Sequence, residues 1–212
     1  LAFEPGGNGG DRVPSPLASR VSDVLDTLDE CARRVFDGFP APLTYVSATQ
    51  INAVVPYEIA DSGSTRITAE INGILSSAFT RPINPSAPAI FTADSSGSGA
   101  AAALNQDFSF NTTTPAARGS VVILYATGEG RTSPPAATGS VTAALRSPQL
   151  NVTATIGGQP AVVDYAGAAP GLVAGVFQVN LRIPNNAPTG AAPVTITVGS
   201  AATQTGVTVS IQ

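Results

Sequence analysis

Residues 37–56 read DGFPAPLTYVSATQINAVVP, and residues 157–184 repeat this pattern as GGQPAVVDYAGAAPGLVAGVFQVNLRIP. The two copies lie 120 to 128 positions apart and share a glycine, a Pro-Ala pair, a tyrosine, a Gln-x-Asn triplet and a closing proline. These are turn formers and β-type residues, with no nucleophile, base or metal ligand among them. The duplication therefore predicts two related structural units, and it favours a function in shape and surface over a chemical reaction.

The composition removes many enzyme mechanisms. The 212 residues include no His, all ten basic residues are Arg, and there is a single Cys. Without His, a Ser-His-Asp triad, a Cys-His pair and an imidazole metal site are excluded. Without Lys, Schiff-base chemistry and a Lys-bearing phosphate loop are excluded as well. We therefore expect a protein that is not an enzyme, with no catalytic residues, no cofactor and no metal.

The charge pattern bears on partners. Ten Arg stand against fourteen acids, which gives a net charge of −4, and the only adjacent basic pair is Arg33-Arg34. Nucleic-acid binding normally needs clustered basic residues, so we expect no nucleic-acid partner. Charged residues make up only 11% of the chain, and such a surface protects poorly against self-association. The protein is therefore expected to pack against copies of itself or partners, or to work outside the cell as an uncharged module that can carry a glycan.

The sequence contains no apolar run of the roughly 18 to 20 residues that a membrane helix needs, so we expect no membrane span. The chain begins at Leu1. The simplest interpretation is that a targeting segment has been removed, which predicts an extracellular or cell-surface protein. Cys31 cannot form an intrachain disulfide, so it is either an idle buried thiol or an intermolecular crosslink.

Short β-rich runs recur between turn residues, and this pattern is typical of an all-β sandwich. Alternation of apolar and hydroxyl side chains is clearest in residues 194–198 and 207–211, which predicts half-buried antiparallel strands. The expected strands are residues 34–36, 43–46, 50–55, 65–71, 78–83, 89–92, 101–105, 120–127, 151–156, 161–165, 176–183, 193–198 and 206–211.

One stretch has a different period. Between Ser22 and Arg34, apolar residues recur at three- and four-residue spacing, with acids early and arginines late, which favours a helical turn. The repeat alignment instead sets this stretch against residues of the second half that have loop and strand patterns, so both interpretations stay open.

The boundary between the units is expected near residues 81–88, where three prolines in seven positions indicate a stiff hinge. The predicted domains are residues 1–84 and 85–212. About 70 residues precede the motif in the second unit but only 36 in the first, so the first unit is short of N-terminal strands. A sandwich that lacks strands leaves backbone groups unpaired, and a strand donated by a neighbouring chain would fill the gap.

Four blocks of the sequence are long and ordered: residues 36–57, 88–92, 124–130 and 165–172. They resemble the uncharacterised carboxy-terminal domain family of Solibacter-type acidobacterial exported proteins. The resemblance covers roughly residues 35–212, and residues 1–34 depart from it. It implies an all-β fold of two tandem immunoglobulin-like antiparallel β-sandwiches in an exported protein, with no assigned catalytic residues to carry over.

Acidic and glycine-rich segments are weak candidates for sites. Asp23, Asp26, Asp29 and Glu30 lack the glycine and alternating oxygen ligands of a calcium loop, so a solvated acidic face is the better interpretation. The loop Asp94–Gly97 is an equally weak oxygen-ligand loop. A glycosidase with paired carboxylates is disfavoured because the chain has no Trp and only 6% aromatic residues.

Three further motifs have a structural interpretation beside a functional one. Residues 124–130, LYATGEG, lack the lysine of a phosphate loop and are better explained as a strand that runs into a glycine turn. Asn111 and Asn151 each begin a glycosylation tripeptide. Tyr45 and Tyr165 could bind a ligand, although core or corner residues with backbone-bonded hydroxyls fit the pattern better.

These observations predict a structural protein: the self-assembling subunit of a surface filament or layer, a homo-oligomer or polymer with strand complementation between subunits. The alternative is an adhesion or carbohydrate-binding module of a larger secreted protein. That alternative predicts an exposed aromatic or acidic patch in the loops at one end of a sandwich.

Overall fold

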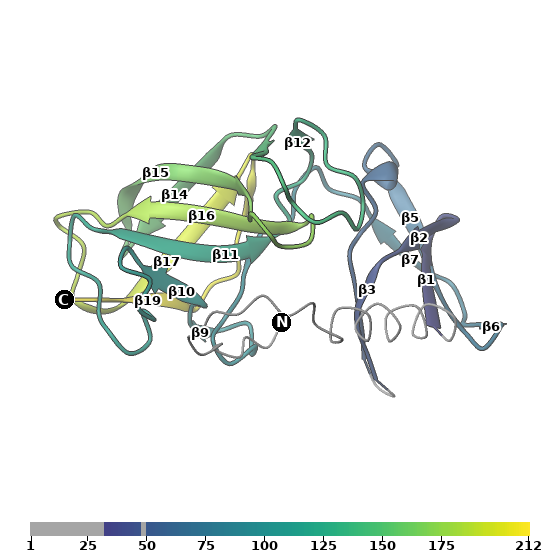
Figure 1. Cartoon of the computed structure of the whole chain (residues 1–212), viewed down its shortest axis with the longest axis horizontal. Helices are drawn as coiled ribbons and strands as arrows, with labels where there is room; N and C mark the ends of the chain where they lie inside the picture. The colour runs from purple at the N-terminus through teal and green to yellow at the C-terminus, as the bar shows by residue number, and fades with distance from the viewer. Residues whose placement is uncertain (1–31, 48–49) are drawn as a thin grey trace, which may run out of the picture. The chain divides into compact units, whose positions relative to one another are not determined.

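The computed structural model describes residues 32–47 and 50–212, and in these residues the protein is all-β. The chain divides into two compact units, with the boundary between Ile83 and Asn84. Paired strands among the described residues run antiparallel, except for one short parallel pair in unit 2 (Figure 1). Within the described ranges, no helix has the length and apolar character needed to cross a bilayer.

The described residues of unit 1 form seven strands and one turn of 3-10 helix, η1. The elements are β1 (Ala32–Phe36), β2 (Phe39–Ala41), β3 (Leu43–Val46), β4 (Ile51–Ala53), η1 (Tyr57–Ile59), β5 (Ser64–Ile71), β6 (Ile74–Leu75) and β7 (Phe79–Pro82).

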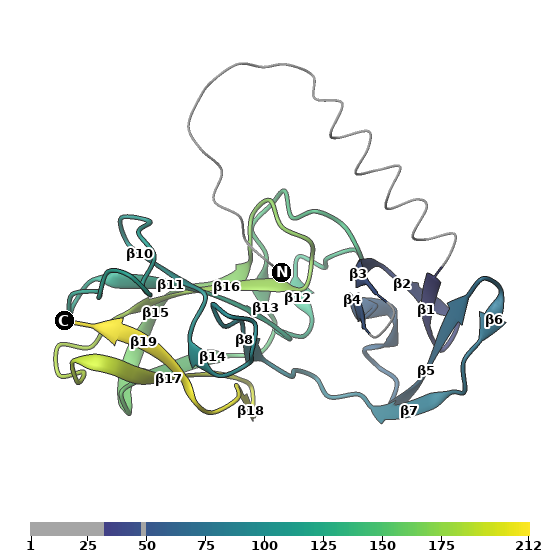
Figure 2. The same cartoon turned by 90° about the horizontal axis from the view of Figure 1, so that it is seen from below.

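The main sheet of unit 1 is built around β5. On one side β5 pairs with β1, which in turn pairs with β2. On the other side β5 pairs with β6 and β7, which follow one another along it (Figure 2). The hairpin of β3 and β4 forms a separate two-stranded sheet. The described residues of unit 1 thus form one five-stranded sheet and one separate hairpin.

Unit 2 contains the remaining twelve strands. They are β8 (Ala89–Ile90), β9 (Gly99–Ala100), β10 (Ala103–Asn105), β11 (Val121–Thr127), β12 (Thr132–Ser133), β13 (Ser147–Pro148), β14 (Val152–Ile156), β15 (Gln159–Ala168), β16 (Val176–Arg182), β17 (Gly190–Val198), β18 (Ala201–Ala202) and β19 (Val207–Ile211).

Ten strands of unit 2 form one continuous sheet that is compatible with a β-sandwich. The strand order in this sheet is β10-β11-β16-β15-β14-β17-β19-β9. In addition, β8 pairs with β11 and β18 pairs with β17. The long strand β15 connects the two halves, because its first part pairs with β14 and its last part with β16. A register shift between Val163 and Tyr165 follows within the pairing with β16.

The two units differ greatly in the size of their cores. Unit 2 encloses a cluster of 21 buried apolar residues, centred on side chains such as Phe177, Leu124 and Ile196. Among the described residues of unit 1, the corresponding cluster contains Phe36, Ala41 and Ile59, with Ala53, Ile67 and Ile83 packed against it. Buried apolar surface offsets the entropy of folding. The described part of unit 1 therefore contributes much less of this stabilisation than unit 2 does.

Each expected strand coincides with an observed one, within a few residues at its ends. Sequence reasoning missed the short strands β2, β6, β9, β12, β13 and β18, because two or three residues carry no detectable period. The helical interpretation of Ser22–Arg34 is wrong at its end, where residues 32–34 belong to β1 and pair with β5. Residues 22–31 lie outside the described residues.

The proline-rich segment expected to be a hinge is partly fixed to unit 2. Ser86 donates its hydroxyl to the backbone carbonyl of Val198 at 2.8 Å, and the Ala87 amide donates to the Gly128 carbonyl at 3.0 Å. A β-carbon at Gly128 would lie 1.9 Å from the Ala87 carbonyl oxygen, so only glycine permits this approach. Residues 85–87 therefore belong structurally to unit 2.

Candidate functional site

Two hairpins give the units a common internal register. Strands β1 and β2 reverse through Asp37 and Gly38, both at positive φ, so that Phe36 opposes Phe39. Strands β14 and β15 reverse through Gly157 and Gly158, also at positive φ. In the following hairpins, Tyr45 opposes Asn52 and Tyr165 opposes Asn180, each beside a register shift two residues before the tyrosine. Positions in one unit can therefore be compared with positions in the other.

The candidate site begins at the outer edge of β4. In unit 2, the strand at this position, β16, is paired on both sides, with β15 and with β11. Among the described residues, β4 pairs only with β3. The Val54 N–H donates to the carbonyl of Pro42, the residue just before β3. Successive residues of a strand direct their backbone N–H and C=O groups to opposite sides, so those of Ile51 and Ala53 point to the free edge. Such an edge can accept another strand.

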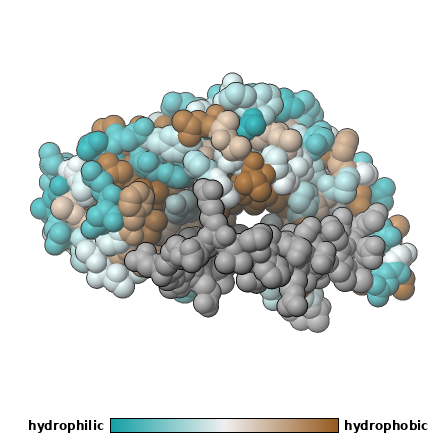
Figure 3. Space-filling model, in the orientation of Figure 1, coloured by the Kyte–Doolittle hydropathy of each residue, from teal (hydrophilic) through white to brown (hydrophobic). Residues whose placement is uncertain are grey.

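Four apolar side chains of unit 1 are exposed, and we call them together the open face: Val55, Ile71, Ile74 and Phe79. Ile71, Ile74 and Phe79 lie on the same side of their sheet as the buried Phe36, because the register pairs Phe36 with Ile67, Ile67 with Phe79 and Ile71 with Ile74. Figure 3 shows apolar side chains at the surface of both units.

The equivalent positions in unit 2 are buried. Phe79 is 52% exposed, whereas Val207, at the same register position on β19, is fully buried. Val55, before the motif's closing proline, is 54% exposed, whereas Ile183 at the same place is 1% exposed. In unit 2 these side chains are covered with the help of β11 and its neighbours. The described part of unit 1 contains no strand in that place, and this leaves its face open.

Arginine lies at one end of the open face. The Arg81 guanidinium lies 3.7 Å from the centre of the Phe79 ring, a cation–π contact. Arg81 is two residues beyond Phe79 in β7, so it points to the same side of the sheet. The corresponding residue in β19 is the buried Val209. A cation thus occupies a position that is apolar and enclosed in unit 2, which is tolerated because unit 1 is open there.

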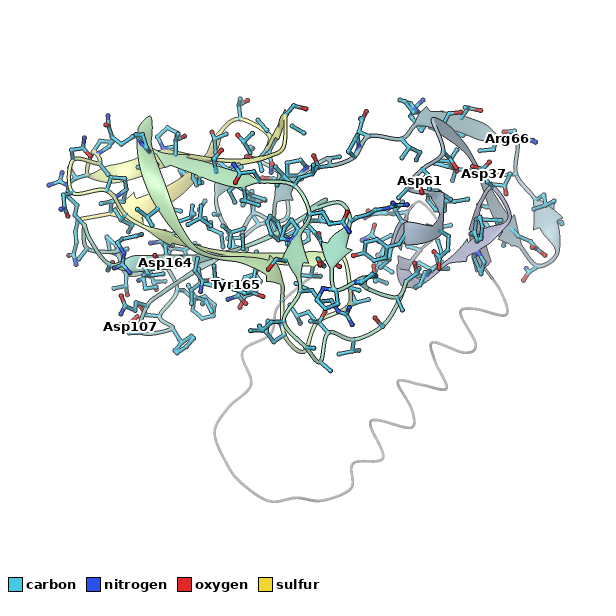
Figure 4. The ribbon with its side chains drawn as sticks, turned by 90° about the horizontal axis from the view of Figure 1, so that it is seen from above. Asp37, Asp61, Arg66, Asp107, Asp164 and Tyr165 are labelled. Carbon is cyan, nitrogen blue, oxygen red and sulfur yellow. The ribbon has the colours of Figure 1, made fainter. Side chains whose placement is uncertain are left out.

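The turn of the first hairpin is stabilised by a carboxylate. Asp37 accepts the backbone N–H of Arg66 at 2.9 Å, which ties the turn to β5 (Figure 4). This bond lowers the pKa of Asp37 below its ordinary value. The residue is fully exposed and has a structural role, because it caps the turn.

The two tyrosines of the repeated motif differ in exposure. Tyr165 is partly buried, and its hydroxyl donates to the Ala168 carbonyl at 2.9 Å, as expected for a corner residue. Burial raises the pKa of the Tyr165 hydroxyl. Tyr45 is half exposed, so the expectation of a core position is wrong for that residue.

The two glycosylation tripeptides are not equivalent in structure. Asn111 is buried, and its amide donates to Asn105 Oδ1 and to the Ser210 carbonyl while its oxygen accepts the Ser210 N–H at 2.7 Å. This side chain is already fully engaged. Asn151 is exposed at the start of β14. A glycan could therefore be attached at Asn151 without unfolding the sandwich, but not at Asn111.

The other motifs have local structural partners. The Asp94 carboxylate accepts the Ser96 N–H at 3.1 Å within its own loop, which lowers the pKa of Asp94. Residues 124–130 form the end of β11 and a turn with Gly128 and Gly130 at positive φ, as expected. Across the described ranges, no three His, Cys, Asp or Glu gather as a metal site would require. The acidic cluster at residues 23–30 and Cys31 lie outside those ranges.

Comparison with known proteins finds no family model and no curated protein that matches this chain.

Sequence reasoning predicted a shortage of strands in the first unit, but it did not identify the exposed residues of the open face. Val55, Ile71 and Phe79 have the apolar alternation of ordinary core positions. The one signal was Arg81, which interrupts the apolar pattern where the second unit has Val209.

Proposed function

We propose that this chain is a non-enzymatic extracellular structural protein, the self-assembling subunit of a surface filament or layer. In this proposal, the open face of unit 1 and the free edge of β4 are covered by a segment of a neighbouring molecule, with strand complementation along β4. The observation that carries it is the contrast at matched positions, where Phe79 and Val55 are half exposed and Val207 and Ile183 are buried. Burial of apolar side chains drives most association between proteins.

We also propose that both units are immunoglobulin-like sandwiches in tandem. The common hairpin register and the shared tyrosine-associated shift support a common design. Unit 2 pairs β16 with β11, and an equivalent strand is what unit 1 would receive from its neighbour. The resemblance of residues 35–212 to an exported domain family supports an extracellular location.

Strand complementation predicts a specific effect of proline in β4. The N–H of Ala53 points to the free edge, so Ala53→Pro removes a donor that β3 does not use. Ala53→Ser keeps this N–H and serves as the control. Electron microscopy and analytical ultracentrifugation of the full chain should show concentration-dependent polymers for the wild type and Ala53→Ser, and much weaker association for Ala53→Pro.

The proposal is wrong if the wild-type protein stays monomeric at millimolar concentration, or if Ala53→Pro assembles as the wild type does. Circular dichroism spectra that match the wild type would show that the variants are folded.

A further inference from the structure

Two exposed phenylalanines lie in the loop of unit 2 that connects β10 and β11. Phe108 is 72% exposed, and Phe110, two residues later, is also exposed. Asp107 precedes them at the margin of unit 2 (Figure 4). Large apolar side chains on a polar loop cost solubility and contribute no core packing, so a contact with a partner is a natural explanation for them.

Hydrogen bonds from two buried asparagines hold the loop rigidly. The buried Asn105 donates to the Ser109 hydroxyl at 3.0 Å and to the Thr114 carbonyl at 2.8 Å. The buried Asn111 links Asn105 to β19, as described above. Because both asparagine amides are used within the fold, the loop presents its rings without a large ordering cost on binding.

The backbone at Phe108 is strained. Its φ is +65°, a conformation that glycine adopts readily and that bulky residues avoid. Glycine or asparagine at this position would relieve the strain. Strain of this kind persists where the side chain has a role, and here the side chain points to solvent instead of the core. The ring at position 108 is therefore a candidate for binding.

The open face of unit 1 requires a partner of matching chemistry. Its apolar side chains favour apolar groups. Among the described residues the Arg81 guanidinium donates to the Thr80 carbonyl at 3.3 Å and has no acidic partner, so an acid is favoured there because covering a cation without an anion is costly. Asp107 provides such an acid beside two phenyl rings. Hydrogen bonds from Ser109 to Asp107 Oδ1 lower the pKa of Asp107, so its carboxylate is charged at neutral pH. By contrast, Asp164, near the exposed Val162, already pairs with Arg182 at 2.7 Å.

We infer that the loop containing Asp107, Phe108 and Phe110 docks onto the open face of unit 1 in a second copy of this chain, with Asp107 beside Arg81. This inference rests on the proposed function and names the segment that covers the open face, in addition to the strand added along β4. The donor loop and the acceptor face are different surfaces of the same chain, so the contact is head-to-tail. A head-to-tail contact that does not close into a ring generates a filament.

Phe108→Gly separates docking from folding. Glycine suits the positive φ, so the thermal midpoint should equal or exceed that of the wild type, while the association constant measured by ultracentrifugation falls at least about tenfold, as loss of a buried aromatic anchor predicts. Phe108→Asn should behave in the same way. Leu145→Asn removes a similarly exposed apolar side chain elsewhere in unit 2 and should leave association unchanged.

A charge exchange tests the pairing of the two surfaces. Asp107→Arg and Arg81→Asp should each weaken association, and the double variant should recover much of it. The inference is overturned if the Phe108 variants associate as the wild type does, or if the double variant is no better than either single variant. It is also overturned if Phe108→Gly abolishes glycan binding on an array while assembly is unchanged.

Failure of the inference and failure of the proposed function give different results. If the wild type and Phe108→Gly both polymerise while Ala53→Pro does not, the self-assembly proposal stands and the docking loop is wrong. If the wild type never associates, both are wrong.

Discussion

Val55→Ala and Val198→Ala each remove two methyl groups. Val55 is a half-exposed side chain of unit 1, and Val198 is a buried side chain of unit 2. Val198 is fully buried in β17, whereas Val55 is 54% exposed on the open face. At about 0.8 kcal/mol per buried carbon, Val198→Ala loses about 1.6 kcal/mol of transfer free energy. A residual cavity adds about 1 kcal/mol, which gives a total of about 2.5 kcal/mol.

Val55→Ala should cost the isolated chain about 0.8 kcal/mol or less, because about half of the side chain already lies in water and no closed cavity forms. Native-state hydrogen exchange followed by mass spectrometry in increasing urea measures each unit separately, since peptides report the unit from which they come. The protein should be held at a concentration at which it is monomeric.

A large loss at position 55 would refute this reasoning. If Val55→Ala destabilised the monomer as much as Val198→Ala, unit 1 would already have a closed core at that position. At higher concentration the same substitution should weaken association about fourfold, because the remaining half of the side chain is expected to be buried in the contact.

Further substitutions test the turns and the buried polar network. Gly128→Ala should lower the stability of unit 2 by more than about 2 kcal/mol, because a β-carbon there meets a backbone carbonyl. Gly158→Ala meets open space and should cost only about 1 kcal/mol, because of the positive φ at that position. Thermal melts of the two variants measure this difference. Asn111→Ala leaves the Ser210 N–H without its acceptor and should cost about 1–3 kcal/mol in urea denaturation, and a neutral result would show that the network is dispensable. The pKa of Asp37 is lowered in the folded state, so its bond stabilises the first hairpin above about pH 4 and is lost as the pH falls through the folded pKa. Asp37→Asn should therefore reduce the loss of protection in unit 1 between about pH 5 and pH 2, and an unchanged acid profile would contradict this assignment.

The strands could be predicted because their apolar periods and turn residues are local. Residues 194–198 and 207–211 alternate cleanly, and Gly157-Gly158 marks a two-residue hairpin by composition alone. The division near Ile83 follows a proline-rich segment that is visible in the sequence. Local chemistry was sufficient for these features.

The open face could not be predicted in the same way, because exposure depends on strands that are distant in the sequence. Val55 and Ile183 have nearly the same local sequence, and only the presence of β11 beside β16 distinguishes their surroundings. Phe108 at positive φ is also unpredictable, since bulky residues avoid that conformation.

Hydrogen exchange of residues 51–55 as a function of protein concentration tests most directly whether unit 1 is completed by another molecule. If another molecule completes unit 1, the amides of Ile51 and Ala53 become protected as the concentration rises, while those of β11 in unit 2 stay equally protected throughout. Protection of β4 that does not change with concentration would contradict completion of unit 1 by another molecule.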